Sequence, residues 1–424
     1  MRSFLPEALP NLLLGWRWPT ALRALRHRNF RLFFFGQLIS LSGTWMQTTA
    51  QQWLVYRLTG SQLSLGVVTF ASFLPVLLLS LFMGVIVDRV PRRRLLVFTQ
   101  TWFMLCAVAL AWLTAAGIIR YSYIIALASL LGLANALDMP ARQAFYVDMV
   151  ERQDLMNAIA LNSSVFNGAR IIGPALGGVV VAALGEAPAF ASNAVSFLAV
   201  IAALLLMRLP STASTPRRAT AVSELMQGLH YLAEDRRVLG LVTMVAAFSL
   251  IGFPYFTLLP VFASDILRTG ASGLGALMAA MGVGALVGAL SLAVYGDRSA
   301  GQGRGKGWLL EVNRWLFIAA LGVFGVSRTP ALSMAALVVG GYAFITQLAI
   351  TNTLIQLLVP DDRRGRVMSI YTWALGGFWP LGALLIGAVG DALGAPNAVL
   401  LSASASLALT VLGGLAFAET RRLA

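Results

Sequence analysis

Long apolar stretches separated by short charged segments run through this chain of 424 residues. Twelve stretches are about 20 residues or longer, and as helices rising about 1.5 Å per residue they would each cross a hydrocarbon core of about 30 Å. Leu, Ala, Gly and Val recur without strict two-residue alternation, which predicts helices and not barrel strands. The predicted spans are 31–57, 64–87, 95–117, 122–146, 157–183, 188–208, 237–263, 273–296, 308–326, 331–358, 366–389 and 395–417.

Composition indicates the same class of protein. Hydrophobic residues make up 58% of the chain and charged residues 11%, whereas a soluble globular domain has roughly a quarter charged residues. We therefore expect an all-α integral membrane protein in which each span satisfies its backbone hydrogen bonds internally. The single cysteine, Cys106, lies inside the third apolar stretch and excludes an intramolecular disulfide.

The net charge of +14 is unevenly divided between the two sets of loops. If the N-terminus is inside, the outer loops hold only Arg57, Arg120, Arg268 and Arg328 of the 31 basic residues. This positive-inside bias predicts a protein of the inner (plasma) membrane with both termini in the cytoplasm. The placement of the charge favours contact with anionic membrane lipid, so we expect no nucleic-acid partner.

The segment between the sixth and seventh spans differs from the rest of the chain. It is first rich in Ser, Thr and Pro and then amphipathic, which predicts a cytoplasmic linker containing a short surface helix. The chain then divides into a cytoplasmic N-terminal segment (1–29), a six-helix half (30–208), the linker (209–236), a second six-helix half (237–418) and a cytoplasmic tail (419–424).

A weak internal repeat relates the two halves. The loop sequence GVIVDRVPRRRLL around Asp88 has a shorter counterpart, AVYGDR, around Asp297, and the offset is 297 minus 88, or 209 residues. The same offset pairs Gly173 with Gly382. Parallel halves joined by an inside linker are typical of transporters whose binding site lies between the halves near the midplane.

Charged residues inside the apolar stretches are candidate functional groups. Arg170 lies roughly 20 Å into the fifth span, where an unpaired cation costs several kcal/mol. Asp138 in the fourth span is one possible partner and has Arg142 one turn away, while Asp148 and Glu151 are others. A partly buried acid between two arginines could exchange protons as access alternates. A static structural ion pair explains the pattern equally well.

Enzyme chemistry and metal binding find no support in the sequence. His27 and His230 lie in predicted cytoplasmic segments without a Cys, His or acidic cluster at metal spacing. GQGRGKG departs from the phosphate-binding pattern GxxxxGK[ST], because Ala300 and Gly307 occupy two of its defining positions. We expect no enzyme activity, cofactor or metal, so an ion gradient or the gradient of the cargo would drive transport.

The loop GVIVDRVPRRRLL resembles the signature between helices two and three of the major facilitator superfamily, although Pro91 stands where glycine is usual. The resemblance covers essentially the whole chain and implies twelve transmembrane helices in two six-helix halves. It also implies that Asp88 caps a nearby helix N-terminus, pairs with arginines such as Arg92 and closes an inner gate; alternatively, these charges only set the topology. The signature residues are Gly84, Asp88, Arg89, Arg92 and Arg93.

The fifth span contains GPALGG, which resembles the GPxxGG element of antiporters and exporters in this superfamily. Its residues are Gly173, Pro174, Gly177 and Gly178, with alanine at two upstream positions where the family has glycine. Close helix packing and a bend at Pro174 are the alternative explanation. The stretches RHRNFRLFFFGQLISLSGTWMQ, NAIALNSSVFNGARIIGPALGG and RGRVMSIYTWALGGFWPLGAL resemble the exporter branch that includes enterobactin and macrolide efflux proteins.

Helices one, four, seven and ten should then line a central cavity. Amide and aromatic residues share faces of the first and tenth spans or surround a bend in the seventh, although ordinary packing could also explain them. Few charges among them favour a bulky, amphipathic or weakly polar cargo. The candidates are Gln47, Gln51, Phe253, Tyr255, Phe344, Gln347 and Thr351.

These features predict a monomeric secondary active transporter that exports a small molecule by alternating access in exchange for protons. The cargo would be a drug, a siderophore or a similar amphipathic metabolite. An uptake facilitator for a sugar or metabolite and a lipid flippase of the same fold are alternatives. A non-transporting membrane receptor or scaffold is an alternative of another class.

Overall fold

The computed structural model describes residues 20–208, 221–300, 305–417 and 419. A short helix, η1 (Thr20–Arg26), precedes six long helices that form the first half of the bundle. The six are α1 (Arg28–Thr59), α2 (Gln62–Arg89), α3 (Arg92–Ala115), α4 (Tyr121–Met149), α5 (Leu155–Leu184) and α6 (Glu186–Leu206), with η2 (Arg152–Asp154) before α5.

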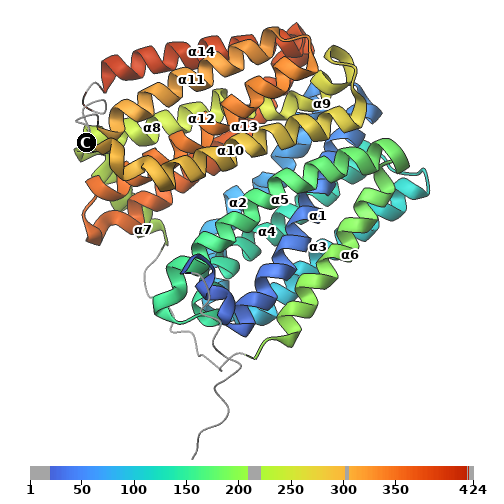
Figure 1. Ribbon diagram of the computed structural model, residues 1–424, viewed down its shortest axis with the longest axis horizontal. Coiled ribbons are helices and arrows are strands. Elements are labelled where there is room, and N and C mark those ends of the chain that lie inside the picture. Colours follow the sequence, from blue (N-terminus) through green and yellow to red (C-terminus); the bar gives the residue numbers. More distant parts are fainter. Residues whose placement is uncertain (1–19, 209–220, 301–304, 418, 420–424) are drawn as a thin grey trace, which may run out of the picture.

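The second half follows the linker helix α7 (Ala221–Glu234). In Figure 1 its helices, yellow to red, lie above the blue and green helices of the first half. They are α8 (Arg236–Ile251), η3 (Phe253–Leu258), α9 (Leu259–Val261), η4 (Phe262–Ile266), α10 (Gly270–Ala300), α11 (Lys306–Val326), α12 (Pro330–Leu358), α13 (Asp361–Leu393) and α14 (Ala395–Ala416).

The helices match the predicted membrane spans. Among the described residues, eleven helices are long and apolar enough to cross a membrane. α1 is also long enough at 32 residues, but its many amides and hydroxyls lower its hydropathy. Large apolar side chains such as Leu412 and Leu415 are exposed on the outside, whereas Gln37 and Thr49 are buried. This distribution fits a bundle surrounded by lipid, and the predicted all-α fold with twelve spans in two halves is confirmed.

The seventh span differs from the single helix predicted over 237–263. It divides into α8, a 3₁₀ turn (η3), the short α9 and a π-helical turn (η4). Pro254 and Pro260 lie in the broken region, where each removes a backbone donor and prevents a regular helix from continuing. Discontinuous helices of this kind place irregular backbone inside the bundle and away from lipid.

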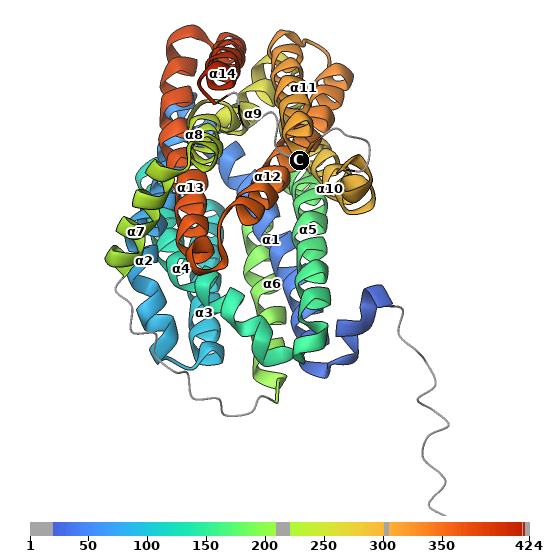
Figure 2. The same cartoon turned by 90° about the vertical axis from the view of Figure 1, so that its left-hand side faces the viewer.

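The two halves pack along two pairs of helices, α5 with α10 and α2 with α13 (Figure 2). Glycines permit this close approach. A methyl group on Gly275 would lie 2.4 Å from the Pro174 carbonyl oxygen, and one on Gly66 would lie 2.4 Å from that of Ala383. Both contacts lie toward the end of the bundle where α1 finishes and α2 begins, so the halves are joined at that end.

Candidate functional site

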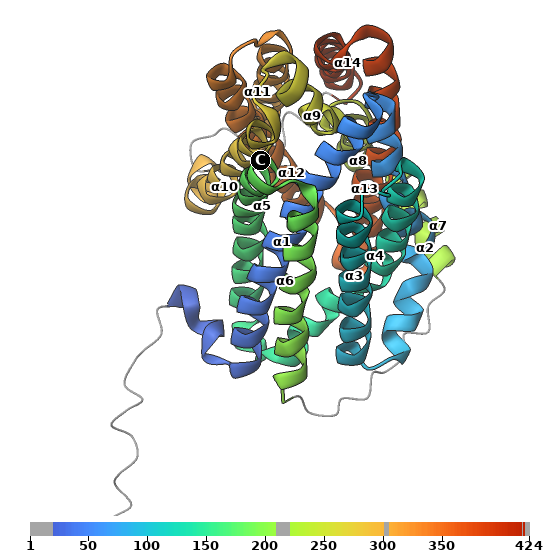
Figure 3. The same ribbon diagram turned by 90° about the vertical axis from the view of Figure 1, so that its right-hand side faces the viewer.

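A buried cation near the centre of the bundle is contacted by both halves. Arg170 lies near the middle of α5 and is 7% exposed. Its guanidinium carbon is 5.8 Å from the centre of the Trp45 ring on α1 and 5.9 Å from the centre of the Phe344 ring on α12. Figure 3 shows α1 and α5 side by side, while α12 belongs to the second half. The cation therefore depends on aromatic rings from two independent sets of helices.

Arg170 has no acidic partner among the described residues. Its Nε atom is buried without a hydrogen-bond acceptor, and no described carboxylate lies within 4.0 Å of the guanidinium. A buried charge costs free energy unless it is paired. Cation–π contacts offset part of that cost, about 2 kcal/mol for a desolvated pair. The rings supply no lone-pair acceptors, so the N–H donors of the guanidinium remain available.

The second half surrounds this cation with aromatic rings and unpaired polar atoms. The Phe253 ring centre is 4.5 Å from that of Phe344, and the Tyr255 hydroxyl lies 3.3 Å from the Met281 sulfur. On the same face of α12 as Phe344, Gln347 and Thr351 each bury a side-chain oxygen that has no hydrogen-bond partner. The cavity residues predicted in the seventh and tenth spans thus lie together.

The two glutamines predicted for the cavity wall, Gln47 and Gln51, differ in burial and in hydrogen bonding. The Gln47 carbonyl accepts a hydrogen bond of 2.7 Å from the Asn193 amide of α6, and Gln47 is buried. Gln51 is half-buried. In this structure Gln47 belongs to the α1–α6 contact inside the first half. This contact follows from the close packing of Gly43 against Asn193 one turn earlier, and the place of Gln47 in the cavity wall stays a prediction.

Asp138 forms a closed polar cluster within the first half. Its carboxylate accepts hydrogen bonds from the Thr99 hydroxyl at 2.7 Å, the Gln100 amide at 2.8 Å and Arg142 Nε at 3.0 Å. Arg142 also donates to Asp138 through a second nitrogen and to the amide oxygen of Gln37. Asp138 is 1% exposed, so four donor contacts satisfy an almost fully buried acid.

The acids considered as partners of Arg170 are engaged elsewhere. Asp138 pairs with Arg142, Asp148 with Arg92 at 3.0 Å, and Glu151 with Arg26 at 3.6 Å. The expectation failed because α4 and α5, although consecutive, make few contacts, while α5 packs mainly along α1 and α10. A short connection along the chain did not make these two helices close neighbours.

The arginine-rich loop after α2 contacts only its own half through the side chains described. Arg92 donates to Asp148 and to the Ala144 carbonyl, and Arg93 donates to the Leu205 carbonyl at 2.5 Å. Asp148, the acid that pairs with Arg92, lies at the far end of α4, and the expected pair between Asp88 and Arg92 stays a prediction. Arg89 is exposed. The side chains of Gly84 and Asp88 lie outside the described residues, and the gate role of this loop stays a prediction.

The GPALGG element packs on two sides of α5. Methyl groups placed on Gly173 and Gly177 would lie 2.6 Å from the Ser42 carbonyl oxygen and 3.0 Å from that of Met46, both on α1. The backbone at Pro174 and Gly178 faces α10 instead. The element therefore fixes α5 against its own half and also brings it against the other half.

The comparisons with known proteins agree with this architecture. Residues 19–421 match the family described as transmembrane secretion effector. The chain belongs to this family.

Curated relatives of this chain are transporters. It is 28% identical to the staphyloferrin A transporter of Staphylococcus aureus, in a match covering 86% of this chain and 90% of that protein. It is 27% identical to the multidrug efflux pump Tap of Mycolicibacterium fortuitum, in a match covering 86% of this chain and 89% of that protein. The enterobactin exporter EntS of Shigella flexneri is 26% identical and covers 96% of each chain. The predicted resemblance to major facilitator exporters is confirmed.

A solved structure shows the same fold. The nucleoside transporter NupG superposes with a TM-score of 0.69 at 15% sequence identity, covering 94% of this chain and 99% of that one. Family and relatives together show that this chain is a multi-pass membrane transporter and not an enzyme, as the sequence predicted.

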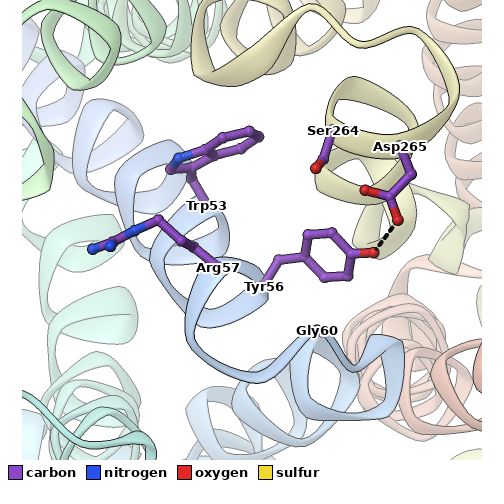
Figure 4. A pocket seen from close by; sticks show the side chains of 6 residues that line it. All are labelled: Trp53, Tyr56, Arg57, Gly60, Ser264 and Asp265. Carbon is purple, nitrogen blue, oxygen red and sulfur yellow. Dashed lines mark hydrogen bonds between the residues drawn. The ribbon is translucent and has the colours of Figure 1, made fainter.

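A pocket opens where the two halves of the bundle meet at the joined end. It has a volume of about 270 Å³ and is drawn in Figure 4. Trp53, Tyr56 and Arg57 come from the last turns of α1; Tyr56 points toward η4, where its hydroxyl donates to Asp265 at 2.5 Å, whereas Arg57 points away from η4 and pairs with Glu186 of α6 at 2.8 Å. No sequence pattern singled out Tyr56 or Asp265, because they lie 209 residues apart and in different halves.

Two other residues of the site were missed for the same reason. Trp45 and Asn193 lie in apolar stretches that look like ordinary packing surface. The only available signal for Trp45 was its position beside Gly43 and Thr44 in a polar part of the first span. Only the packing of α1 against α5 and α6 assigns Trp45 to Arg170 and Asn193 to Gln47.

Proposed function

We propose that this protein exports a small molecule by alternating access between its two halves. The supporting observation is the position of Arg170, which contacts Trp45 of its own half and Phe344 of the second half. Each residue lies near the middle of its helix, where transporters of this architecture bind cargo. The names of the curated relatives, which include an efflux pump and a siderophore exporter, favour export.

We assign the joined end of the bundle to the outside of the cell. At this end Asp391 of α13 accepts hydrogen bonds from the Ser61 hydroxyl at 2.7 Å and from the backbone N–H of Gln62 at 2.6 Å. The acid thereby caps the N-terminus of α2 from the opposite half. The arginine-rich loops lie at the other ends of the helices, and the positive-inside rule places those ends in the cytoplasm. The structure would then be closed toward the outside.

Proton exchange is our proposal for the source of energy, with Asp138 as the acid to test. Its saturated hydrogen bonding favours a fixed carboxylate, so the test must separate coupling from architecture. In proteoliposomes with an imposed pH gradient, Asp138→Asn is compared with the parent at equal protein amounts. Loss of uphill transport with preserved downhill exchange supports coupling through Asp138. Normal uphill transport by the variant removes it from the mechanism.

Export itself is tested in inverted membrane vesicles energised by respiration. A panel of neutral, cationic and anionic fluorescent compounds is offered on the cytoplasmic face, which is then outside. We expect at least one compound to accumulate in vesicles that contain the protein and not in vesicles without it. Accumulation only in right-side-out vesicles would support the uptake alternative, and movement only of a fluorescent phospholipid would support the flippase alternative.

A further inference from the structure

We propose that Arg170 binds an anionic group of the cargo, so that the transported molecule is an acid with a flat apolar part and hydrogen-bonding groups. This inference rests on the proposed export function and specifies its substrate class. It begins with a contrast between three arginines inside the bundle, of which Arg170 and Arg314 are buried and Arg142 is half-buried. Arg142 pairs with Asp138 and Arg314 pairs with Glu311 at 2.9 Å, whereas Arg170 lacks a carboxylate among the described residues.

The surroundings of Arg170 hold its charge without occupying its donors. The Trp45 and Phe344 rings attract the guanidinium through their faces but accept no conventional hydrogen bond. A guanidinium has five N–H donors in a planar fork that matches a carboxylate or phosphate in bidentate geometry. An anion bound there would pair the charge, and a flat apolar part of the same molecule could pack against the rings.

A polar strip on α5 leads from this cation toward the predicted cytoplasmic end. Ser163, Asn167 and Arg170 follow each other at helical spacing and share one face of the helix. Ser163 is exposed and Asn167 is half-buried, and the Asn167 amide donates to the Ser163 carbonyl at 2.8 Å. Phe166, between them, contacts Trp45 with ring centres 6.0 Å apart. This strip offers an acidic cargo a route to Arg170 from the side opposite the joined end.

The facing helix of the second half supplies further polar atoms. Gln347 Oε1 and Thr351 Oγ1 are buried without partners on the face of α12 that also carries Phe344. An unpartnered buried oxygen is costly and is satisfied by a donor from a ligand. Hydroxyl or amide groups on the cargo fit this requirement, which narrows the substrate class to hydroxylated or amide-bearing organic acids.

Binding to the purified protein in detergent tests the inference without any transport step. The probes are 2-hydroxybenzoate and 2-hydroxybenzamide, which have nearly the same shape and differ in negative charge. Apparent affinities follow from the melting temperature as a function of probe concentration. We expect the parent to bind the carboxylate about 10-fold or more tightly than the amide, and Arg170→Gln to lose this preference. Arg170→Lys, which keeps the charge without the planar fork, should retain part of it.

Arg120→Gln is the matched control, because it removes the same charge from an exposed position at the start of α4. It should keep the parent preference. Equal binding of both probes, binding of neither, or an unchanged preference in Arg170→Gln overturns the inference. A purely structural arginine would instead lower the melting temperature of the probe-free Arg170→Gln protein while leaving the preference intact. Failure of export in vesicles would count against the proposed function alone, since this binding measurement does not depend on it.

Discussion

Two of the buried charge sites of the first half, at Asp138 and at Arg170, differ in how completely they are satisfied. Asp138 and Arg142 share a cluster with Thr99, Gln100 and Gln37, and every member lies on α1, α3 or α4. Arg170 is only a few helix turns away along the bundle, yet it has aromatic rings and no described acid around it. One site is complete within its half, and the other is incomplete without a partner or a ligand.

This difference indicates which site responds when the halves move. The Asp138 cluster can travel as a unit, because no member belongs to the second half. The contact between Arg170 and Phe344 must break or shift whenever the halves separate at mid-depth. Burial of a charge therefore does not by itself identify a functional residue; the satisfaction of its hydrogen bonds and the helices that supply them separate the two roles.

The largest expected effect comes from breaking the complete site. Asp138→Ala leaves the half-buried Arg142 without its acid and the buried Thr99 and Gln100 without this acceptor, which we expect to lower the free energy of unfolding by about 3–5 kcal/mol. Protein level in the membrane and melting temperature in detergent measure this. Adding Arg142→Gln to Asp138→Ala should recover most of the lost free energy of unfolding, because the unpaired charge is removed. Independent, additive effects of the two changes would contradict the cluster described here.

A smaller effect is expected from separating the halves. In Gly275→Ala the new methyl group would lie 2.4 Å from the Pro174 carbonyl oxygen, and overpacking of this kind costs about 1–3 kcal/mol. Spin labels near the joined ends of α2 and α13 should report a longer distance, because the joined state is weakened. Gly322→Ala on α11 is the control, since nothing lies within 4 Å of the added group.

The same variant sharpens the comparison between the charge sites. In Gly275→Ala we expect the anion preference measured through Arg170 to change, because Phe344 moves with the second half. The destabilisation caused by Asp138→Ala should stay the same in the Gly275→Ala background. If the Gly275→Ala background changes the destabilisation caused by Asp138→Ala, the stability of the Asp138 cluster depends on the position of the second half.

The smallest effect is expected at the pocket of the joined end. Tyr56→Phe removes the hydrogen bond to Asp265, and because Asp265 is exposed we expect a loss of only about 1 kcal/mol. Measured with the same spin labels, the ratio of molecules with separated halves to molecules with joined halves should rise a few-fold. Tyr123→Phe, at an exposed tyrosine of α4, should leave the population unchanged. If both variants behave alike, the Tyr56–Asp265 contact does not hold the halves together.

Much of the fold was predictable because lipid imposes simple rules on a sequence. A span must be long, apolar and helical, and eleven of the predicted spans appear as helices whose ends lie within a few residues of the prediction. The seventh span is the exception in detail. The sequence predicted a bend beside Phe253 and Tyr255, but it did not indicate that the helix would divide into 3₁₀, α and π turns.

The candidate site was predictable residue by residue but not in its pairings. Arg170, Asp138 and Phe344 stood out as charges or aromatics at particular depths. Which of them meet depends on helix neighbours, and consecutive helices such as α4 and α5 need not pack together. For that reason the expected partnership of Arg170 with Asp138 was wrong, while the contact of Arg170 with Phe344 was not foreseen.

The sequence by itself determined that this chain is a helical membrane protein with two related halves and a few charges in the apolar interior. Periodicity, length and charge placement are local properties of the sequence. In a membrane they are enough to predict the spans and their orientation. Only the tertiary structure decided that Asp138 is fully satisfied inside one half and that Arg170 faces the other. Hydrogen bonds and ring contacts act over a few ångströms, between helices that can be more than a hundred residues apart in the chain, and no local pattern records which side chains those helices bring together.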